Sequence, residues 1–253
     1  MHRYLNLMFA GLLTTAGSAA GCASDSATTT TTTTTGADSI PTVFQKFGAG
    51  VTVTRDGNFI VLHTANLPDH RSAYWPTSDS RYQAYNGTNA NYSRAGSQVI
   101  IAQQLTFRIP VNPAVASTHA ATPLGPIGIA VNGVSLFNQY NGQNNPLTVE
   151  INTFDQWNGH PTPTNMYHYH SEPTWITSAK GADALIGFLL DGFPVYGPKE
   201  GSKTITNADL DAYHGHVAVT ADYPGGIYHY HITSADPYIN GSGFYGTAGT
   251  VAQ

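Results

Sequence analysis

The chain is poor in cysteine, methionine and charged residues. Cys22 is its only cysteine, Met166 is the only methionine that follows it, and Asp, Glu, Lys and Arg make up 10% of 253 residues. A thiolate- and thioether-rich Cu(I) site is therefore excluded. The formal net charge is −5 and the basic residues form no stripe, so neither nucleic acid nor an anionic membrane surface is an expected partner.

The chain also lacks the short motifs of common hydrolases and phosphate-binding proteins. It contains no Gly-x-Ser-x-Gly, no His-Glu-x-x-His and no phosphate loop. Whether the protein is an enzyme therefore depends on whether it holds a metal with an open coordination position.

The N-terminus is typical of a bacterial lipoprotein. Residues 1–21 contain Arg3, then a short apolar stretch and small residues, which predicts a signal peptide that is too short to span a bilayer easily. The sequence before Cys22, Ala-Ala-Gly, is similar to a lipobox, although Leu is commoner than Ala three residues before the cysteine. We expect a mature protein anchored to a membrane of the cell envelope, periplasmic or at the cell surface, through lipid on Cys22. An ordinary secretory signal with an incidental cysteine is the alternative.

A tether and one β domain follow. Residues 22–40 contain eight consecutive threonines and nothing to bury, so they are predicted to be a disordered tether. Residues 41–253 alternate short β-rich runs with turns and show little helical periodicity. We expect one mainly β domain, an antiparallel β-sandwich or partly closed barrel. The predicted strands include residues 99–109, 147–154 and 216–220, and type I′ turns are favoured at Asn132-Gly133 and Asp191-Gly192.

The tetrapeptide Tyr-His-Tyr-His occurs twice, at residues 167–170 and 228–231. Each copy is preceded by an Asp-x-x-x-Gly-His block, and further upstream by an Asn/Asp-Gly turn between apolar runs. The blocks recur in one order, which predicts two structural repeats, about 127–173 and 186–237, packed as pseudo-symmetric halves. In a strand, residues i and i+2 share a face, so each tetrapeptide places two imidazoles on one face and two phenols on the other.

This order of motifs, with "GFLLDGFPVYGP" between the two tetrapeptides, resembles the YHYH protein family. Further similar segments are "NLPDH" at residues 66–70, "LTFRIPVNP" at 105–113 and "LGPIGIAVNGVSLFN" at 124–138. The resemblance covers roughly residue 50 to the C-terminus and implies no established activity. Members often carry cysteines in the Gly-His block and near the C-terminus, where disulfides are plausible, whereas this chain has none there.

Six histidines stand in equivalent positions of the two repeats and are the candidate metal ligands. They are His160, His168, His170, His216, His229 and His231. One centre takes about four ligands, so either one site lies on the pseudo-twofold axis or each repeat forms its own. His70, after Pro-Asp, is an extra candidate ligand, whereas the other histidines are expected to be structural or exposed. The alternative for all six is a structural role in the β core.

Three aspartates could support these ligands. Asp155 and Asp211 each stand five residues before a candidate histidine, and Asp191 belongs to the second Asn/Asp-Gly turn. Each could accept a ring N–H and so orient a metal-bound imidazole. The alternative for Asp155 and Asp211 is to cap a turn, since Asp before Gly often bonds its own backbone.

Imidazole ligands suit several transition metals, among which we expect copper first and zinc second. With copper, the four tyrosines of the tetrapeptides could be redox-active neighbours, although packing in the core is their commoner role. Three functions follow. The first is an envelope lipoprotein that handles or senses a metal, and the second is a metalloenzyme, an oxidase or hydrolase. The third is an adhesion or glycan-binding module with a tryptophan surface and structural histidines, whose protein or glycan partner the sequence does not identify.

Changing Cys22 to Ser tests the predicted anchor. The wild-type protein should fractionate with membranes and carry fatty acid on its N-terminal peptide, because lipidation needs the thiol. Cys22→Ser should lose the lipid and fail to mature normally, as measured by mass spectrometry and fractionation. Recovery of wild type in the soluble fraction without a fatty-acid mass would contradict the lipoprotein assignment.

Overall fold

Two large β-sheets form the described part of the chain, residues 39–241 and 243–253, in this computed structural model. The predicted signal peptide, Cys22 and the tether as far as residue 38 lie outside the described residues. The helical elements are short: the 3-10 turns η1 (Thr42–Lys46), η2 (Glu150–Thr153) and η3 (Asn207–Asp209), and the helix α1 (Thr174–Lys180). None of the described helices has the length and apolar character that crossing a bilayer requires.

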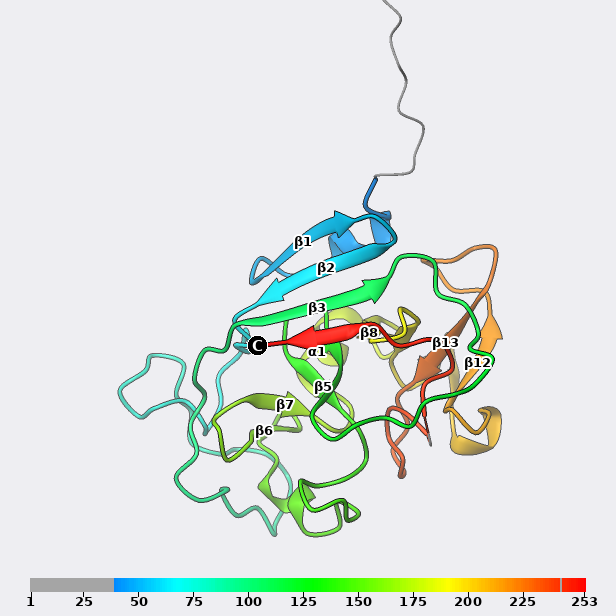
Figure 1. The fold of residues 1–253 in the computed structure, drawn as a ribbon. Coiled ribbons are helices and arrows are strands. Elements are labelled where there is room, and N and C mark those ends of the chain that lie inside the picture. The colour runs from blue at the N-terminus through cyan, green and yellow to red at the C-terminus, as the bar shows by residue number, and fades with distance from the viewer. Residues whose placement is uncertain (1–38, 242) are drawn as a thin grey trace, which may run out of the picture. The chain divides into compact units, whose positions relative to one another are not determined.

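The smaller of the two large sheets has four antiparallel strands in the order β1-β2-β3-β14. Their bounds are β1 Val51–Asp56, β2 Phe59–Thr64, β3 Leu105–Pro110 and β14 Thr250–Ala252. Strand β3 alternates between buried and half-buried residues, with Leu105, Phe107 and Ile109 buried. The alternation shows that one face of this sheet covers the core (Figure 1).

The larger sheet has eight strands, and their order is the same when each half is followed outward from the centre. The order is β12-β13-β9-β8-β4-β5-β7-β6. The first repeat supplies β4 (Pro126–Ala130), β5 (Ser135–Phe137), β6 (Gly159–Pro161) and β7 (Tyr167–Tyr169). The second supplies β8 (Leu185–Leu189), β9 (Pro194–Tyr196), β12 (Gly215–Ala218) and β13 (Ile227–His231). In both halves the inner hairpin is antiparallel, the next pairing is parallel, and the outer pairing is antiparallel.

The two halves meet where β4 pairs with β8. Ile129 faces Phe188 across this pair, flanked by Gly128 opposite Leu189 and Ala130 opposite Gly187. An antiparallel pair has a local twofold axis, and here that axis relates residues 59 positions apart, the offset between the Asn/Asp-Gly turns. The central pairing thus generates the symmetric strand order.

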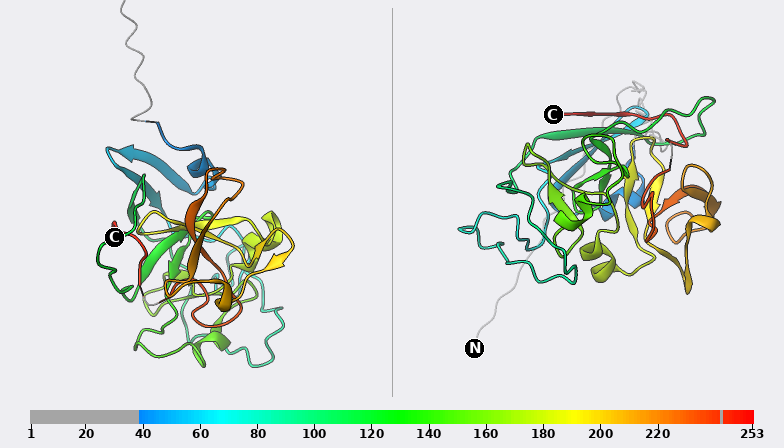
Figure 2. Two further views of the ribbon diagram at one scale, coloured as in Figure 1. Left: turned by 90° about the vertical axis from the view of Figure 1, so that its right-hand side faces the viewer. Right: turned by 90° about the horizontal axis from the view of Figure 1, so that it is seen from below.

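The two sheets pack on one hydrophobic core, which confirms the mainly β prediction, with two packed sheets and no closed barrel (Figures 1 and 2). Ile60 and Phe107 of the small sheet are fully buried, as are Ile129 and Phe188 of the large one. Phe44 of η1 stacks on Phe188, with ring centroids 4.5 Å apart. A separate two-stranded ribbon, β10 (Lys199–Glu200) and β11 (Lys203–Thr204), lies between β9 and η3 in the chain.

Some local predictions were wrong. Of the strand expected over residues 99–109, only the part from Leu105 is a strand, and residues 147–154 contain the 3-10 turn η2 in place of a strand. The strand expected over 216–220 is β12 and ends at Ala218. The hairpins at Asn132-Gly133 and Asp191-Gly192 are present, but their turns are not of type I′.

The turn type follows from side-chain hydrogen bonds. A type I′ turn needs positive φ at both central residues, whereas here only the glycines have it, with φ of 89° at Gly133 and 84° at Gly192. Asn132 and Asp191 instead accept the backbone N–H two residues on, at 3.4 and 3.3 Å. The Asn/Asp side chain thus closes the turn, and glycine supplies the left-handed residue after it.

Replacing Gly187 by Ala tests how tightly the central strands meet. A Cβ atom there would lie 2.1 Å from the carbonyl oxygen of Ile129, which is backbone and cannot move aside. We expect Gly187→Ala to lower the free energy of unfolding by about 1–3 kcal/mol, the usual range for overpacking. Gly50→Ala, where a Cβ meets nothing within 4 Å, is the matched control. Equal denaturation midpoints for the two variants would contradict this account of the central pair.

Candidate metal centres

The two Tyr-His-Tyr-His segments enter strands β7 and β13, where alternation separates their rings. The tyrosine hydroxyls of the first copy bond to groups on one side: Tyr167 to the carboxylate of Asp155 at 2.8 Å, and Tyr169 to His70 at 2.9 Å. The imidazoles of His168 and His170 lie on the other side, with their Nε2 atoms 2.8 Å apart. Period-two alternation in a strand accounts for this separation.

Each Asp-x-x-x-Gly-His block forms a tight turn that brings a third histidine to this pair. Oδ1 of Asp155 accepts the backbone N–H groups of Trp157 and Gly159, at 2.9 and 3.2 Å. The next residue, His160, then pairs across the strands with His168. In the second repeat Asp211 makes the same two backbone bonds, also 2.9 and 3.2 Å long, and His216 pairs with His229.

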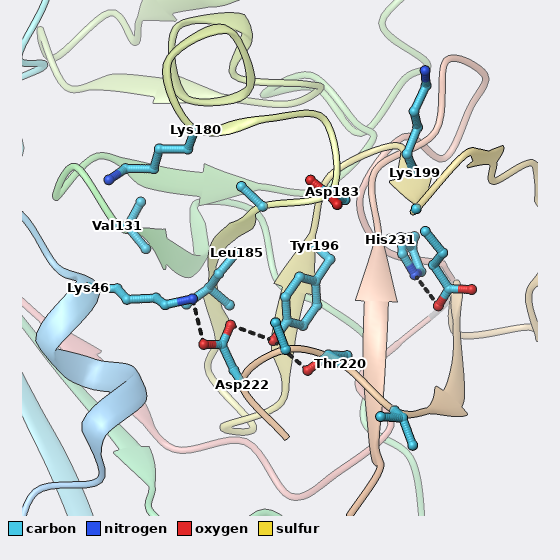
Figure 3. A pocket seen from close by; sticks show the side chains of 15 residues that line it. Lys46, Val131, Lys180, Asp183, Leu185, Tyr196, Lys199, Thr220, Asp222 and His231 are labelled. Atoms are coloured by element: carbon cyan, nitrogen blue, oxygen red, sulfur yellow. Dashed lines mark hydrogen bonds and ion pairs between the residues drawn. The ribbon is translucent and has the colours of Figure 1, made fainter. Parts of the chain in front are cut away.

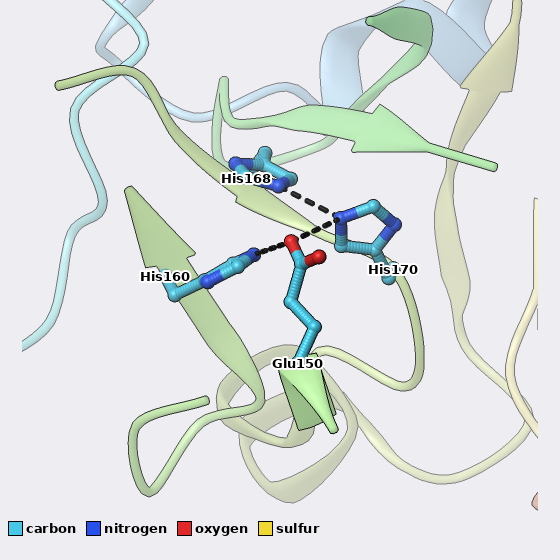
Figure 4. Close-up of side chains that lie close together, drawn as sticks. All are labelled: Glu150, His160, His168 and His170. Atoms are coloured by element: carbon cyan, nitrogen blue, oxygen red, sulfur yellow. Dashed lines mark hydrogen bonds and ion pairs between the residues drawn. The ribbon is translucent and has the colours of Figure 1, made fainter. Parts of the chain in front are cut away.

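The first centre consists of Glu150, His160, His168 and His170. Figure 4 shows the four side chains converging, the carboxylate from η2 and the imidazoles from β6 and the end of β7. Oε1 of Glu150 lies 3.3 Å from Nε2 of His160 and 4.0 Å from Nε2 of His170. The four ligand atoms all lie within 4.8 Å of one another. Ligands about 2.0–2.2 Å from a tetrahedral ion stand about 3.3 Å apart, so the cluster has the dimensions of a metal site.

Backbone and hydroxyl partners fix the tautomer of all three rings. His168 Nδ1 lies 3.1 Å from the carbonyl of Met166, and His170 Nδ1 lies 2.5 Å from that of Asn138. A carbonyl only accepts, so both Nδ1 atoms carry the proton and, in neutral rings, both Nε2 atoms carry a lone pair. Thr153 donates its hydroxyl proton to the carbonyl of Glu150 and therefore accepts from Nδ1 of His160 at 2.7 Å.

The inward-facing nitrogens consequently lack partners. The Nε2 lone pairs of His168 and His170 face each other at 2.8 Å, with no hydrogen on either atom to join them. Nε2 of His160 is buried and makes no hydrogen bond. Protonation does not resolve this, because burial lowers the pKa of His168 well below its ordinary value and that of His170 to about 4. A cation that accepts all three lone pairs would satisfy the cluster.

The second centre, in the other repeat, consists of Glu200, His216, His229 and His231. Oε1 of Glu200 lies 2.8, 3.2 and 3.3 Å from Nε2 of His216, His229 and His231 respectively. The tautomers are fixed at matching positions: His229 Nδ1 donates to the carbonyl two residues before it, as His168 does, and His231 Nδ1 to Gly197, 59 residues after Asn138. Partial burial raises the pKa of Glu200, but the contacts with His216, His229 and His231 together lower it further, so that this pKa lies below its ordinary value.

The two centres differ in their surroundings. The side chains of Glu200 and His216 are 33% and 25% exposed, whereas those of Glu150 and His160 are 24% and 5% exposed, so the two centres differ mainly at the histidine. The first centre lines a cavity of about 290 Å³ with many apolar walls. The second adjoins a more polar cleft of about 540 Å³, where Asp222 bonds to Tyr196 and Lys46 (Figure 3).

The sequence profile of a family described as YHYH protein matches residues 106–207 and 199–243. These segments cover more than half of the chain and contain all eight residues of the two centres. The chain belongs to the YHYH family. No curated protein and no solved structure matches it.

The YHYH domain thus places the six equivalent histidines in two clusters, one per repeat, and does not bring them to one site on the axis. His70 is in neither cluster. It is buried on the tyrosine side of β7, beside the contacting rings of Trp157 and Trp175, and its Nδ1–H donates to the carbonyl of Arg71. His70 therefore supports Tyr169 and lies on the wrong side of the strand to join the first centre.

The three aspartates do not orient the clustered imidazoles. Asp155 and Asp211 cap their turns and accept the hydroxyls of Tyr167 and Tyr228. Asp191 accepts the hydroxyl of Tyr230 at 2.6 Å and the backbone N–H of Gly246 at 2.9 Å, and burial raises its pKa to about 6. The ring N–H partners are main-chain carbonyls and a threonine hydroxyl, so the turn-cap alternative describes Asp155 and Asp211.

Sequence reasoning missed both glutamates. Glu150 is in a 3-10 turn and Glu200 is in the β10–β11 ribbon, 10 and 16 residues before the Gly-His histidines. Their offset of 50 residues matches none of the repeat offsets, so alignment of the repeats does not pair them. The one signal that the sequence offered is the small number of glutamates. The chain has only three, Glu150, Glu172 and Glu200, and two of them belong to the clusters.

The metal-free YHYH domain should lose stability as the pH falls from about 6.5 towards 4. Burial lowers the pKa of His168, His170, His229 and His231 in the folded chain. In that range these histidines bind protons in the unfolded chain but not in the folded chain. The free energy of unfolding therefore decreases as the pH is lowered. For His170, whose pKa falls to about 4, the loss is on the order of 3 kcal/mol.

Urea denaturation of the chelated protein between pH 7 and 4.5 measures this loss. His170→Asn keeps a donor for the Asn138 carbonyl and should flatten the profile. His63→Asn, at an exposed histidine, should leave the slope unchanged. A wild-type profile that is already flat would show that the clustered imidazoles are not held neutral.

Proposed function

We propose that this YHYH protein binds two transition-metal ions, one in each repeat. Each ion is held by Nε2 of three histidines and one carboxylate oxygen. The observation that carries the proposal is the pair of facing Nε2 atoms at 2.8 Å in His168 and His170, whose Nδ1 protons are already bound to carbonyls. Neutral imidazole with a free Nε2 is the form that ligates a metal.

The donor set favours copper(II) first and zinc second. Each centre offers three nitrogens and one oxygen and no sulfur. Imidazole suits both metals, and the affinity order for divalent ions places copper above zinc. Three neutral rings and one carboxylate leave a divalent site with a net charge of about +1. This is a modest charge to bury beside the apolar residues around the first centre.

Metal storage would suit two identical, buried sites. The two sites here differ in exposure, which suits metal handling or sensing better. Four protein ligands fill a tetrahedral shell, as in sites that hold a metal without chemistry. The partly exposed Glu200 and His216 give the second ion a route to solvent, which favours exchange. A metalloenzyme is the second candidate, and the cavity beside the first centre favours it. Burial of Trp75, one of the chain's three tryptophans, argues against a tryptophan surface for the adhesion module.

We place this function at the bacterial envelope, where the predicted lipid on Cys22 would hold the domain on a membrane. The lipobox-like sequence before Cys22 and the threonine-rich tether after it support this placement. A tethered metal-binding domain would sample ions in the periplasm or at the cell surface.

Metal titration of the chelated protein tests the proposal. Wild type should bind two Cu(II) or Zn(II) ions per chain. The double variants His168→Ala/His170→Ala and His229→Ala/His231→Ala should each bind one, because each removes half the ligands of one centre. Isothermal titration with elemental analysis measures the stoichiometry.

Two controls accompany the titration. His63→Ala/His119→Ala removes two histidines outside both centres and should still bind two ions. Tyr169→Phe alters the opposite face of β7 and should also retain both. Unchanged stoichiometry in both centre variants, or no uptake by wild type, would leave the histidines with a structural role only.

A further inference from the structure

The cavity beside the first centre has an apolar wall and a polar floor. Its volume is about 290 Å³, and all four residues of the centre line it. Leu124, Phe137, Pro161 and Pro163 contribute apolar surface. Phe137 also stacks on His168, with ring centroids 4.0 Å apart, so the apolar surface of the cavity extends to a histidine of the first centre.

Two buried polar atoms of residues that line this cavity have no hydrogen-bond partner. One is Nε2 of His160, a ligand atom of the centre. The other is Oε1 of Gln98, which belongs to no centre. A buried acceptor without a donor costs about 1–3 kcal/mol, so a donor group placed in the cavity would stabilise the Gln98 oxygen, which no protein group reaches.

We propose that this cavity binds a small neutral molecule with the size of a single aromatic ring. One lone pair of the molecule would reach the ion, as a fifth ligand, and an N–H or O–H group would meet Gln98. Simple azoles and phenols have this chemistry. The proposal rests on the proposed metal site and adds a ligand class to it.

Size and polarity select this class. Pockets for drug-sized ligands begin near 300 Å³, so this cavity fits a smaller molecule. The apolar wall would penalise a charged group that left water. The cleft at the second centre differs, because Lys46, Asp183 and Asp222 line it and favour polar occupants. The two centres would therefore bind different molecules, although they have the same metal and the same set of protein ligands, because their surroundings differ in polarity.

The test uses Cu(II)-loaded protein and 4-methylpyrazole, with glycine as a polar probe of similar size. In the His229→Ala/His231→Ala variant only the first centre is loaded, and 4-methylpyrazole should shift its visible and electron paramagnetic resonance spectra with saturation. Glycine should need at least a tenfold higher concentration. The His168→Ala/His170→Ala variant, loaded at the second centre only, should lose this preference.

Two variants, made in the His229→Ala/His231→Ala background, test the cavity without touching the metal ligands. Gly142 lines it, and a Cβ there meets nothing within 4 Å, so Gly142→Trp should narrow it and weaken 4-methylpyrazole binding at least tenfold. Gly225→Trp, at an equally open glycine outside this cavity, is the matched control. Gln98→Leu should weaken binding about threefold to tenfold, the effect of one hydrogen bond.

Metal stoichiometry separates the two proposals. One bound Cu(II) with no pyrazole-dependent spectral change, or a change that Gly142→Trp does not affect, overturns the cavity proposal and leaves the metal site standing. Failure of wild type to bind metal overturns both. The metal-free protein could still bind 4-methylpyrazole, as detected by ligand NMR, with Gly142→Trp blocking the binding. That result would support the cavity as a binding site but overturn the proposed bond between the molecule and the ion.

Discussion

The antiparallel pairing of β4 with β8 is the constraint on which the rest of the structure depends. Gly128 and Gly187 allow the two backbones to meet closely, and a twofold relation between them follows from the geometry of the pair. Everything outward of this pair occurs twice: a hairpin, a parallel strand and an outer strand. The two clusters therefore lie towards opposite ends of one sheet, which is why six histidines form two sites.

One face of β7 and β13 carries tyrosines that bind neighbouring turns, and the other carries the clustered histidines. On one face the tyrosine hydroxyls bind Asp155, Asp211 and Asp191, and burial raises the pKa of Tyr167 well above its ordinary value. These bonds join each strand to the turns around it. On the other face the imidazoles are oriented by carbonyls and converge. The tyrosine network thus holds in place the strands that carry the histidine clusters.

Much of this arrangement could be predicted from the sequence, because it depends on local periodicity. Alternation in Tyr-His-Tyr-His predicts which rings share a face, and the repeated blocks predict equivalent positions for His160 and His216. The glutamates could not be predicted, because Glu150 and Glu200 reach their clusters from different local structures. His70 was misplaced for a related reason: it follows an irregular segment, where no periodicity shows which face of β7 it meets.

That difference between the glutamates bears on the choice between structural and metal-binding histidines. Shared descent of the two repeats would by itself explain why the histidines coincide. It does not explain why a 3-10 turn in one repeat and a β-ribbon in the other each bring a carboxylate to the same place. In the first centre, three neutral imidazoles whose N–H groups point outward give the carboxylate no donor, so the acid gains nothing from them alone. The cation that we propose would give both kinds of ligand a partner, and it would be a common reason for the two arrangements.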